Sequence, residues 1–371
     1  MAVSRSMKKN NLLAIAKFVS DGVNVSNSDI AAGLRMSMPT VLQHVKYLQE
    51  QGIIIEKGKF ESNGGRKASV LSIAEDIAYA IGLDIKRDTI IFTLVNMCRE
   101  ILMTQKFDVP FENSLRYFEI IGAYLQKFIE QTQILSKKMI GVGISLPGIV
   151  DAKRKLLLRS HALNVKNVSL QGLERVIGYP IKIENDANCA AYAELRSYCK
   201  NAVYLSLNDT VGGAIFLKGE LYRGEGFKSG EFGHMVIERN GRTCYCGKKG
   251  CIDTYCSAKV LKATAENDLS LFFDKLTKED PVAVAVWKDY SDSLALIVAN
   301  LRMAFDCDIV LGGEVGGYLE QYYTRLVDLT VKYNSFEDDI DYLRIGRYKY
   351  EASSYGASLQ FVSEFFKTMI S

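Results

Sequence analysis

The eight residues 244–251 read CYCGKKGC, a spacing that forces the backbone into a tight loop. Thiolates at positions i, i+2 and i+7, separated by glycines, can converge on one ion. His234 lies ten residues before the first of these cysteines, in GEFGH, and supplies a fourth ligand of a suitable type. The spacing therefore predicts a structural Zn²⁺ site made by His234, Cys244, Cys246 and Cys251. An iron site, or three thiols without metal of which one forms a local disulfide, are the alternatives.

The remaining composition is typical of a water-soluble protein of two or three domains, with 371 residues of which 48% are apolar. No apolar run approaches the roughly 20 residues of a membrane span, and MAVSRSMKKNN lacks the apolar segment of a secretory signal. We therefore expect a cytoplasmic protein without a membrane partner. The other five cysteines are scattered through apolar or helical stretches, unlike a secreted disulfide framework: Cys98, Cys189, Cys199, Cys256 and Cys307.

The first 75 residues carry a net charge of +4, whereas the rest of the chain carries −1. A helical pattern over 8–20 is followed by SNSDIAAGL, in which Ser26 is placed as an N-cap with Asp29 completing a capping box. SMPTVLQHVKYLQEQG then predicts a third helix that Ser37 caps. Two β-rich runs around a glycine-rich tip follow. This order of elements predicts a winged helix-turn-helix domain over residues 1–75.

The third helix places Val41, Val45 and Leu48 on one face, which we expect to pack inward. The opposite face can enter a DNA major groove, and the wing tip NGGRK can contact phosphate or the minor groove. For His44, packing toward the core is favoured over DNA contact, and a solvated hairpin is the alternative for the wing. The predicted DNA contacts are Ser37, Thr40, Gln43, Lys46, Tyr47, Arg66 and Lys67.

Beyond residue 75 the chain alternates strand-like and helical runs, which predicts an α/β fold in two lobes. Within it, GEFGHMVIERNGRTCYCGKKGCIDTYCS resembles the signature of the ROK family (repressors, open reading frames and kinases). LPGIVD, IENDANCAAYAE, VGGAIFLKGELYRG and IVLGG resemble family segments in the same order, so the resemblance covers nearly the whole chain. A winged helix that ends in GGRK resembles the repressor subfamily.

This resemblance implies a two-lobed actin-like ATPase (ribonuclease H-like) fold behind the winged helix. We expect a first lobe formed by 76–190 with the C-terminal helix 352–371, and a second lobe over 191–351 that carries the zinc loop. The resemblance also implies a sugar pocket beside that loop. Its expected contacts are Asn185, Asp186, Glu231, His234 and Asp253. Turn or cap roles are the alternative for Asn185 and Glu231.

One of these positions departs from the family pattern. Asp253 stands where a glutamate is usual, so either the effector differs or a water bridges the missing methylene. Asp186 matches the general base of the family's kinases. However, DIKRD at 84–88 lacks both glycines of the first phosphate-binding hairpin, and NDTVGGA at 208–214 lacks three glycines of the second. The acidic residues Asp88, Asp209 and Glu314 replace uncharged ones.

We therefore expect a regulator rather than an enzyme, with Asp186 at a vestigial base position and no catalytic residue. The predicted function is a sugar-responsive transcriptional repressor that a sugar or sugar derivative releases from a pseudo-palindromic operator, acting as a homodimer or homotetramer. Activation by the effector is left open. The alternatives are a sugar kinase with degenerate loops and a regulator controlled by a protein partner.

Overall fold

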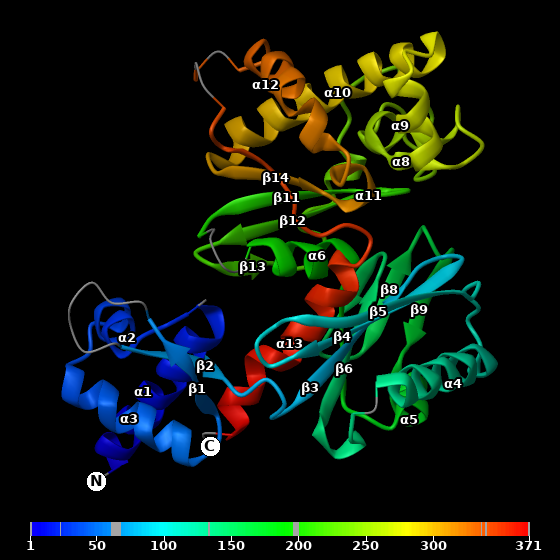
Figure 1. Ribbon diagram of the computed structural model, residues 1–371. Helices are drawn as coiled ribbons and strands as arrows, with labels where there is room; N and C mark the ends of the chain where they lie inside the picture. Colours follow the sequence, from blue (N-terminus) through cyan, green and yellow to red (C-terminus); the bar gives the residue numbers. More distant parts are fainter. Residues whose placement is uncertain are drawn as a thin grey trace.

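The structure is a computed structural model that describes residues 2–22, 24–60, 68–132, 134–195, 200–334, 336–337 and 340–369. It comprises an N-terminal head and two lobes, each built around its own sheet (Figure 1). In the described part of the chain no helix has the length and apolar character required to cross a membrane.

The head consists of three helices and a two-stranded antiparallel sheet: α1 (Ala2–Asp21), α2 (Asn27–Leu34), α3 (Met38–Glu50), β1 (Ile54–Lys59) and β2 (Ser69–Ile73). The capping box at Ser26 and Asp29 forms as the sequence predicts, and the Ser37 side chain caps α3 by accepting from the Thr40 N–H. These caps satisfy backbone donors that a helix start leaves open. The inward face of α3 is buried, with Val41, Val45 and Leu48 at most 3% exposed.

The first lobe is a five-stranded sheet in the order β10-β6-β3-β4-β5. Its strands are β3 (Tyr79–Ile85), β4 (Thr89–Asn96), β5 (Ile101–Asp108), β6 (Met139–Leu146) and β10 (Ile181–Asn185). A small antiparallel sheet extends it: β7 (Ile149–Asp151), β8 (Leu156–Ser160) and β9 (Val165–Ser169). The lobe's helical segments are α4 (Leu115–Thr132), η1 (Ser136–Lys138) and α5 (Gln171–Ile177). The helix after β10, α6 (Asp186–Leu195), leads into the second lobe and packs on the sheet of that lobe.

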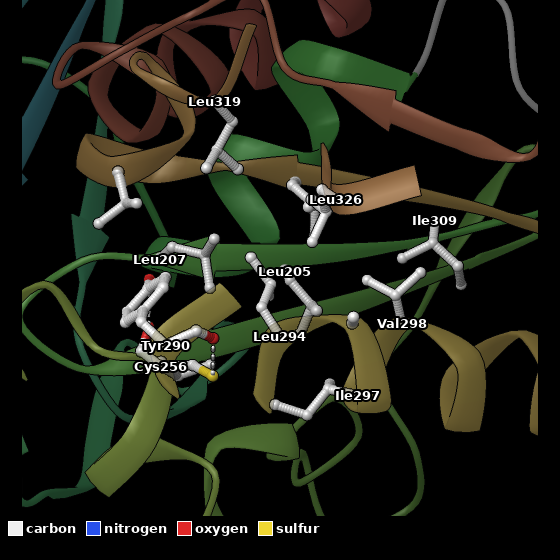
Figure 2. Packing of buried hydrophobic residues seen from close by; sticks show 14 of the residues in the cluster. Leu205, Leu207, Cys256, Tyr290, Leu294, Ile297, Val298, Ile309, Leu319 and Leu326 are labelled. Carbon is white, nitrogen blue, oxygen red and sulfur yellow. Dashed lines mark hydrogen bonds between the residues drawn. The ribbon is translucent and has the colours of Figure 1, made fainter. Parts of the chain in front are cut away.

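The second lobe is a five-stranded sheet in the order β13-β12-β11-β14-β15. Its strands are β11 (Ala202–Leu207), β12 (Val211–Leu217), β13 (Glu220–Tyr222), β14 (Asp308–Gly312) and β15 (Leu343–Ile345). Its helical segments are η2 (Phe232–His234), α7 (Asp253–Cys256), α8 (Ala258–Lys262), α9 (Leu269–Thr277), α10 (Pro281–Phe305), α11 (Gly313–Gly316), η3 (Leu319–Tyr322) and α12 (Tyr323–Val331). Figure 2 shows Leu294 and Val298 of α10 packed toward the sheet residues Leu205 and Ile309, all fully buried.

The C-terminal helix α13 (Ala352–Met369) joins the head to the first lobe, because it packs on β3 and β6 of that lobe and also contacts α1 of the head. Gly82 and Gly143 allow this close approach: a Cβ at Gly82 would lie 1.6 Å from the Ser354 carbonyl oxygen, and one at Gly143 would lie 2.0 Å from that of Ala357. The apolar cluster beneath the head accordingly contains residues of α1, β3, β4 and α13 together. The domain boundaries expected from the sequence stay a proposal.

Candidate functional site

A cavity of ≈ 280 Å³ lies between the two lobes. The first lobe contributes the turn after β6, the end of β8 and the junction of β10 with α6. The second lobe contributes β12, the loop before η2 and the cysteine-bearing loop 244–251 (the metal loop). Four of the five predicted sugar contacts line it together: Asn185, Asp186, Glu231 and His234. A volume near the lower end of the usual range for ligand pockets suits one sugar ring rather than an oligosaccharide.

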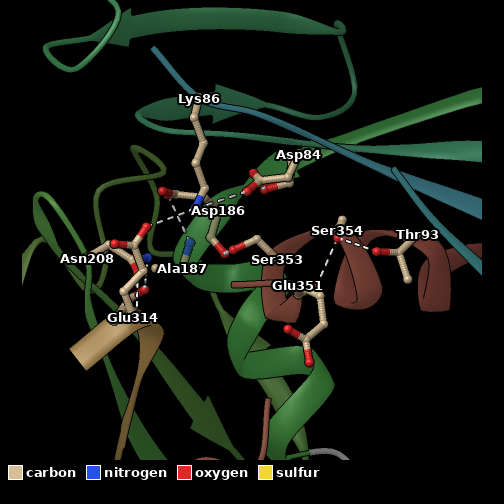
Figure 3. Close-up of polar contacts among 12 residues, drawn as sticks. Asp84, Lys86, Thr93, Asp186, Ala187, Asn208, Glu314, Glu351, Ser353 and Ser354 are labelled. Atoms are coloured by element: carbon tan, nitrogen blue, oxygen red, sulfur yellow. Dashed lines mark hydrogen bonds and ion pairs between the residues drawn. The ribbon is translucent and has the colours of Figure 1, made fainter. Parts of the chain in front are cut away.

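Asn185 and Asp186 are held at the point where β10 ends and α6 begins. The Asn185 side-chain amide donates to the Gly148 carbonyl and to Asp186 Oδ1, each at 3.0 Å. Asp186 Oδ1 also accepts from the Ala187 N–H at 2.9 Å (Figure 3). Burial, followed by the nearby charge of Asp84, raises the pKa of Asp186 to about 7. Its carboxyl can therefore either donate or accept a hydrogen bond near neutral pH.

Glu184 stabilises the junction of β10 with α6 through hydrogen bonds, a role that was not predicted from the sequence. Its Oε1 accepts from the Asn185 N–H at 2.9 Å and from Asn188 Nδ2 at 3.0 Å. Its Oε2 accepts from Arg223 Nε at 2.8 Å, and Arg223 follows β13 in the second lobe. Glu184 is 5% exposed, so these bonds compensate for burying its charge. The sequence signal was a carboxylate directly before Asn185 and Asp186, at a strand position where its neighbour Ile183 is apolar.

Asp253 is the predicted sugar contact that the structure does not bring to the cavity. It is 5% exposed, and its Oδ1 accepts from the Val211 N–H at 2.7 Å. Burial raises the pKa of Asp253 to about 6. Val211 itself lines the cavity. Asp253 therefore fixes the start of β12 behind the cavity wall, and a direct sugar contact by it stays a prediction.

His234, Cys244, Cys246 and Cys251 come together beside the cavity, with all their ligand atoms within 4.8 Å of one another. Cys246 and Cys251 Sγ are 3.7 Å apart, and Cys244 Sγ is 3.8 Å from His234 Nδ1. Tetrahedral Zn–S bonds of about 2.3 Å place two sulfurs about 3.8 Å apart. This cluster can therefore hold a metal ion, and its Cys₃His donor set fits zinc. Zinc would tie the loop 244–251 to η2.

A second polar cluster lies in the cleft between the lobes, next to Asp186 (Figure 3). Lys86, after β3, has its Nζ 3.5 Å from Glu314 Oε1 and 4.0 Å from Asp84 Oδ2. Lys262 Nζ lies 2.7 Å from Glu314 Oε2 and 2.8 Å from Asp209 Oδ1. Glu314 thus pairs with one lysine of each lobe. Asp209 and Glu314 are the two members of this cluster that the sequence indicated, whereas neither lysine was predicted. Asp88, the third acidic residue noted in the sequence, is exposed.

In the head, the predicted DNA contacts on α3 face outward. Ser37, Gln43, Lys46 and Tyr47 are exposed and Thr40 is half-buried. His44 is 6% exposed, and its Nδ1 lies 2.7 Å from the Thr40 carbonyl oxygen, which fits the predicted packing role. The wing residues Arg66 and Lys67 lie outside the described residues. DNA contact by this surface stays a prediction.

The model of the ROK family matches residues 80–359 of this chain. The chain belongs to the ROK family. A putative xylose repressor from Caldicellulosiruptor sp. (strain Rt8B.4) is 26% identical over 364 residues, which cover 91% of each chain. An N-acetylmannosamine kinase from Salmonella arizonae (strain ATCC BAA-731 / CDC346-86 / RSK2980) is 28% identical over 252 residues, 64% of this chain and 84% of the kinase.

Among solved structures, a ROK family transcriptional regulator, described as a homologue of the Escherichia coli MLC protein, superposes with a TM-score of 0.77 at 20% identity. The match covers 98% of this chain and 99% of that one, so this ROK protein shares its fold along the head as well as both lobes. The two-lobed fold preceded by an N-terminal winged helix-turn-helix head is thereby confirmed. The curated relatives include both repressors and kinases, so the family by itself does not decide between regulation and catalysis.

Proposed function

We propose that this ROK protein is a transcriptional repressor that a monosaccharide or monosaccharide derivative releases from its operator. One arrangement carries the proposal: the chain joins an exposed helix-turn-helix face to an interlobe cavity lined by Asn185, Asp186, Glu231 and His234. Amides, carboxylates and an imidazole can together donate to and accept from several hydroxyl groups of one ring. Xylose is the first effector to test, because several similar proteins are named xylose repressors.

The head and the cavity are connected through α13 and through the junction of β10 with α6, which Glu184 stabilises. Asn185 ends β10 and Asp186 begins α6, which packs along α13, and α13 contacts α1 of the head. A ligand that draws the two lobes together changes the position of α6 and hence the support of the head. The effector need only bind the two lobe arrangements with different affinity to shift operator binding.

Operator binding requires a symmetric assembly in this proposal. A winged helix of this kind reads a half-site, so a homodimer or homotetramer would read a pseudo-palindromic operator. Zinc held by the Cys₃His cluster would stabilise the loop that borders the cavity. The place of action is then the cytoplasm, where the operator lies.

The ion-pair cluster in the cleft supports a regulator over a kinase. Lys86 and Lys262 form ion pairs with Glu314 near the hairpins 84–88 and 208–214, where the kinase alternative requires a phosphate donor. Asp209 and Glu314 would also repel phosphate oxygens. One observation favours the kinase: an Asp186 pKa of about 7 suits a general base. Sugar-dependent ADP formation that Asp186→Asn abolishes would establish that alternative.

The deciding experiment is fluorescence anisotropy of the full chain on DNA from upstream of its own coding region, with a panel of pentoses, hexoses, amino sugars and their phosphates. The proposal predicts tight binding that one member of the panel reverses. Binding that no sugar affects would instead indicate control by a protein partner. Protection of a single, unpaired half-site in a footprint would contradict the symmetric assembly.

A further inference from the structure

The side chain of Tyr245 enters the interlobe cavity from the metal loop. Tyr245 lies between Cys244 and Cys246, so any metal held by those thiols also fixes the backbone of the tyrosine. Its ring centroid is 5.3 Å from that of His234, and its Oη is 3.4 Å from His234 Nε2. Both residues line the cavity together with Asn185, Asp186 and Glu231.

The two ring nitrogens of His234 face different partners. Nδ1 is on the side of the cysteine sulfurs, 3.8 Å from Cys244 Sγ, and is the atom that would bind a metal. Nε2 then carries the hydrogen and is the donor that His234 can offer to a ligand in the cavity. Tyr245 Oη already lies against that donor. At 3.4 Å the contact is longer than an ordinary N–H···O hydrogen bond, so a better acceptor can displace it at small cost.

His161 completes an aromatic wall from the opposite lobe. It follows β8, and its ring centroid is 5.7 Å from that of Tyr245 and 6.1 Å from that of His234. These three rings bring together the small sheet of the first lobe and the metal loop of the second. Flat aromatic faces give a sugar ring an apolar surface for its C–H groups, while the hydroxyl groups face the amide and carboxylates.

We propose that Tyr245 is a specificity-determining residue of the effector site, with two opposed effects. Its ring forms the wall on which the C–H face of a monosaccharide rests. Its hydroxyl competes with a sugar hydroxyl for the N–H of His234 Nε2. The inference rests on the proposed sugar-binding function and identifies which residue sets the effector's affinity.

Two variants separate these effects because they shift affinity in opposite directions. Tyr245→Phe keeps the ring and removes the competitor, so it tightens sugar binding by about two- to five-fold. Tyr245→Ala removes the wall and weakens binding by about ten-fold or more. Titration calorimetry with the sugar panel measures both, and elemental analysis checks that the metal content is unchanged. Tyr222→Phe, at an exposed tyrosine outside the cavity lining, is the matched control and leaves affinity unchanged.

A measurement without sugar separates failure of this inference from failure of the proposed function. The chain has three histidines, so labelling them with ¹⁵N gives ring signals for His44, His161 and His234 that substitution of the first two assigns. Tyr245→Phe should shift the Nε2–H signal of His234 and make that hydrogen exchange faster with water. An unchanged signal, or sugar binding that Tyr245→Phe weakens, overturns the role of Tyr245. A shifted signal with no sugar bound by either protein overturns the effector site and the specificity role while keeping the contact.

Discussion

Lys86 of the first lobe and Glu314 of the second meet across the cleft, with Nζ 3.5 Å from Oε1. Their side chains are 29% and 27% exposed, so the pair is shielded from water more than a surface salt bridge. Lys262 holds the other oxygen of Glu314 at 2.7 Å. Loss of Lys86 would leave Glu314 and the buried Asp84 facing each other without the cation between them.

Lys86→Met should therefore loosen the contact between the lobes. We expect hydrogen exchange in the peptides around 84–89 and 313–316 to become faster by about five-fold, as for a loss of about 1 kcal/mol. Lys278→Met is the control, since this lysine is exposed at the end of α9 and lies outside the cluster. Equal exchange in the two variants would show that the pair does not hold the lobes together.

Asp186 should make stability depend on pH. Its pKa is raised from 3.8 to about 7, chiefly by burial, so the protein favours the neutral carboxyl. The stability that this group contributes is complete below pH 3.8 and is lost as the pH rises through about 7. Asp186→Asn mimics the neutral form and keeps an oxygen for the Ala187 N–H.

We expect Asp186→Asn to stabilise the protein by roughly 2 to 3 kcal/mol more at pH 8 than at pH 5, since one pKa unit corresponds to about 1.4 kcal/mol. Thermal unfolding of variant and wild type at both pH values measures this difference, and effects of pH on the metal cluster cancel in the comparison. An equal change in Tm at the two pH values would exclude the raised pKa.

Cys246→Ser should remove one sulfur from the metal cluster and with it the bound ion. The loop 244–251 would then lose its link to His234, and sugar affinity should fall together with metal content. Elemental analysis of the purified proteins gives the first result, with Cys98→Ser as a control outside the cluster. A full metal complement in Cys246→Ser would refute this ligand set.

Substitutions on the exposed face of α3 should separate base reading from phosphate contact. Gln43→Ala is expected to cost about 1–3 kcal/mol of operator binding and to relax the sequence preference. Lys46→Ala is expected to weaken binding to all DNA sequences and to lower the slope of log K against log[salt] by about one. Anisotropy titrations at several salt concentrations test both, and unaltered binding by both variants would place the DNA surface elsewhere.

Local features of the molecule were predictable from sequence because their physical causes act over a few residues. The Ser26 capping box, the Ser37 cap and the inward face Val41, Val45 and Leu48 depend on helical periodicity and neighbouring hydrogen bonds. The Cys₃His cluster was predictable for a similar reason, since a short loop with glycines brings its thiols close to one another. The grouping of Asn185, Asp186, Glu231 and His234 came from the family resemblance.

The sequence alone thus determined the helices and strands of the head, the members of the Cys₃His cluster and the family of the two lobes. Only the tertiary structure decided that Asp253 bonds to Val211 behind the cavity, that Lys86 and Lys262 share Glu314, and that Tyr245 meets His161 at the cavity wall. These contacts join residues 42 to 228 positions apart on different elements. Their geometry depends on how the two lobes and their loops pack, and no local pattern in the chain encodes that distance.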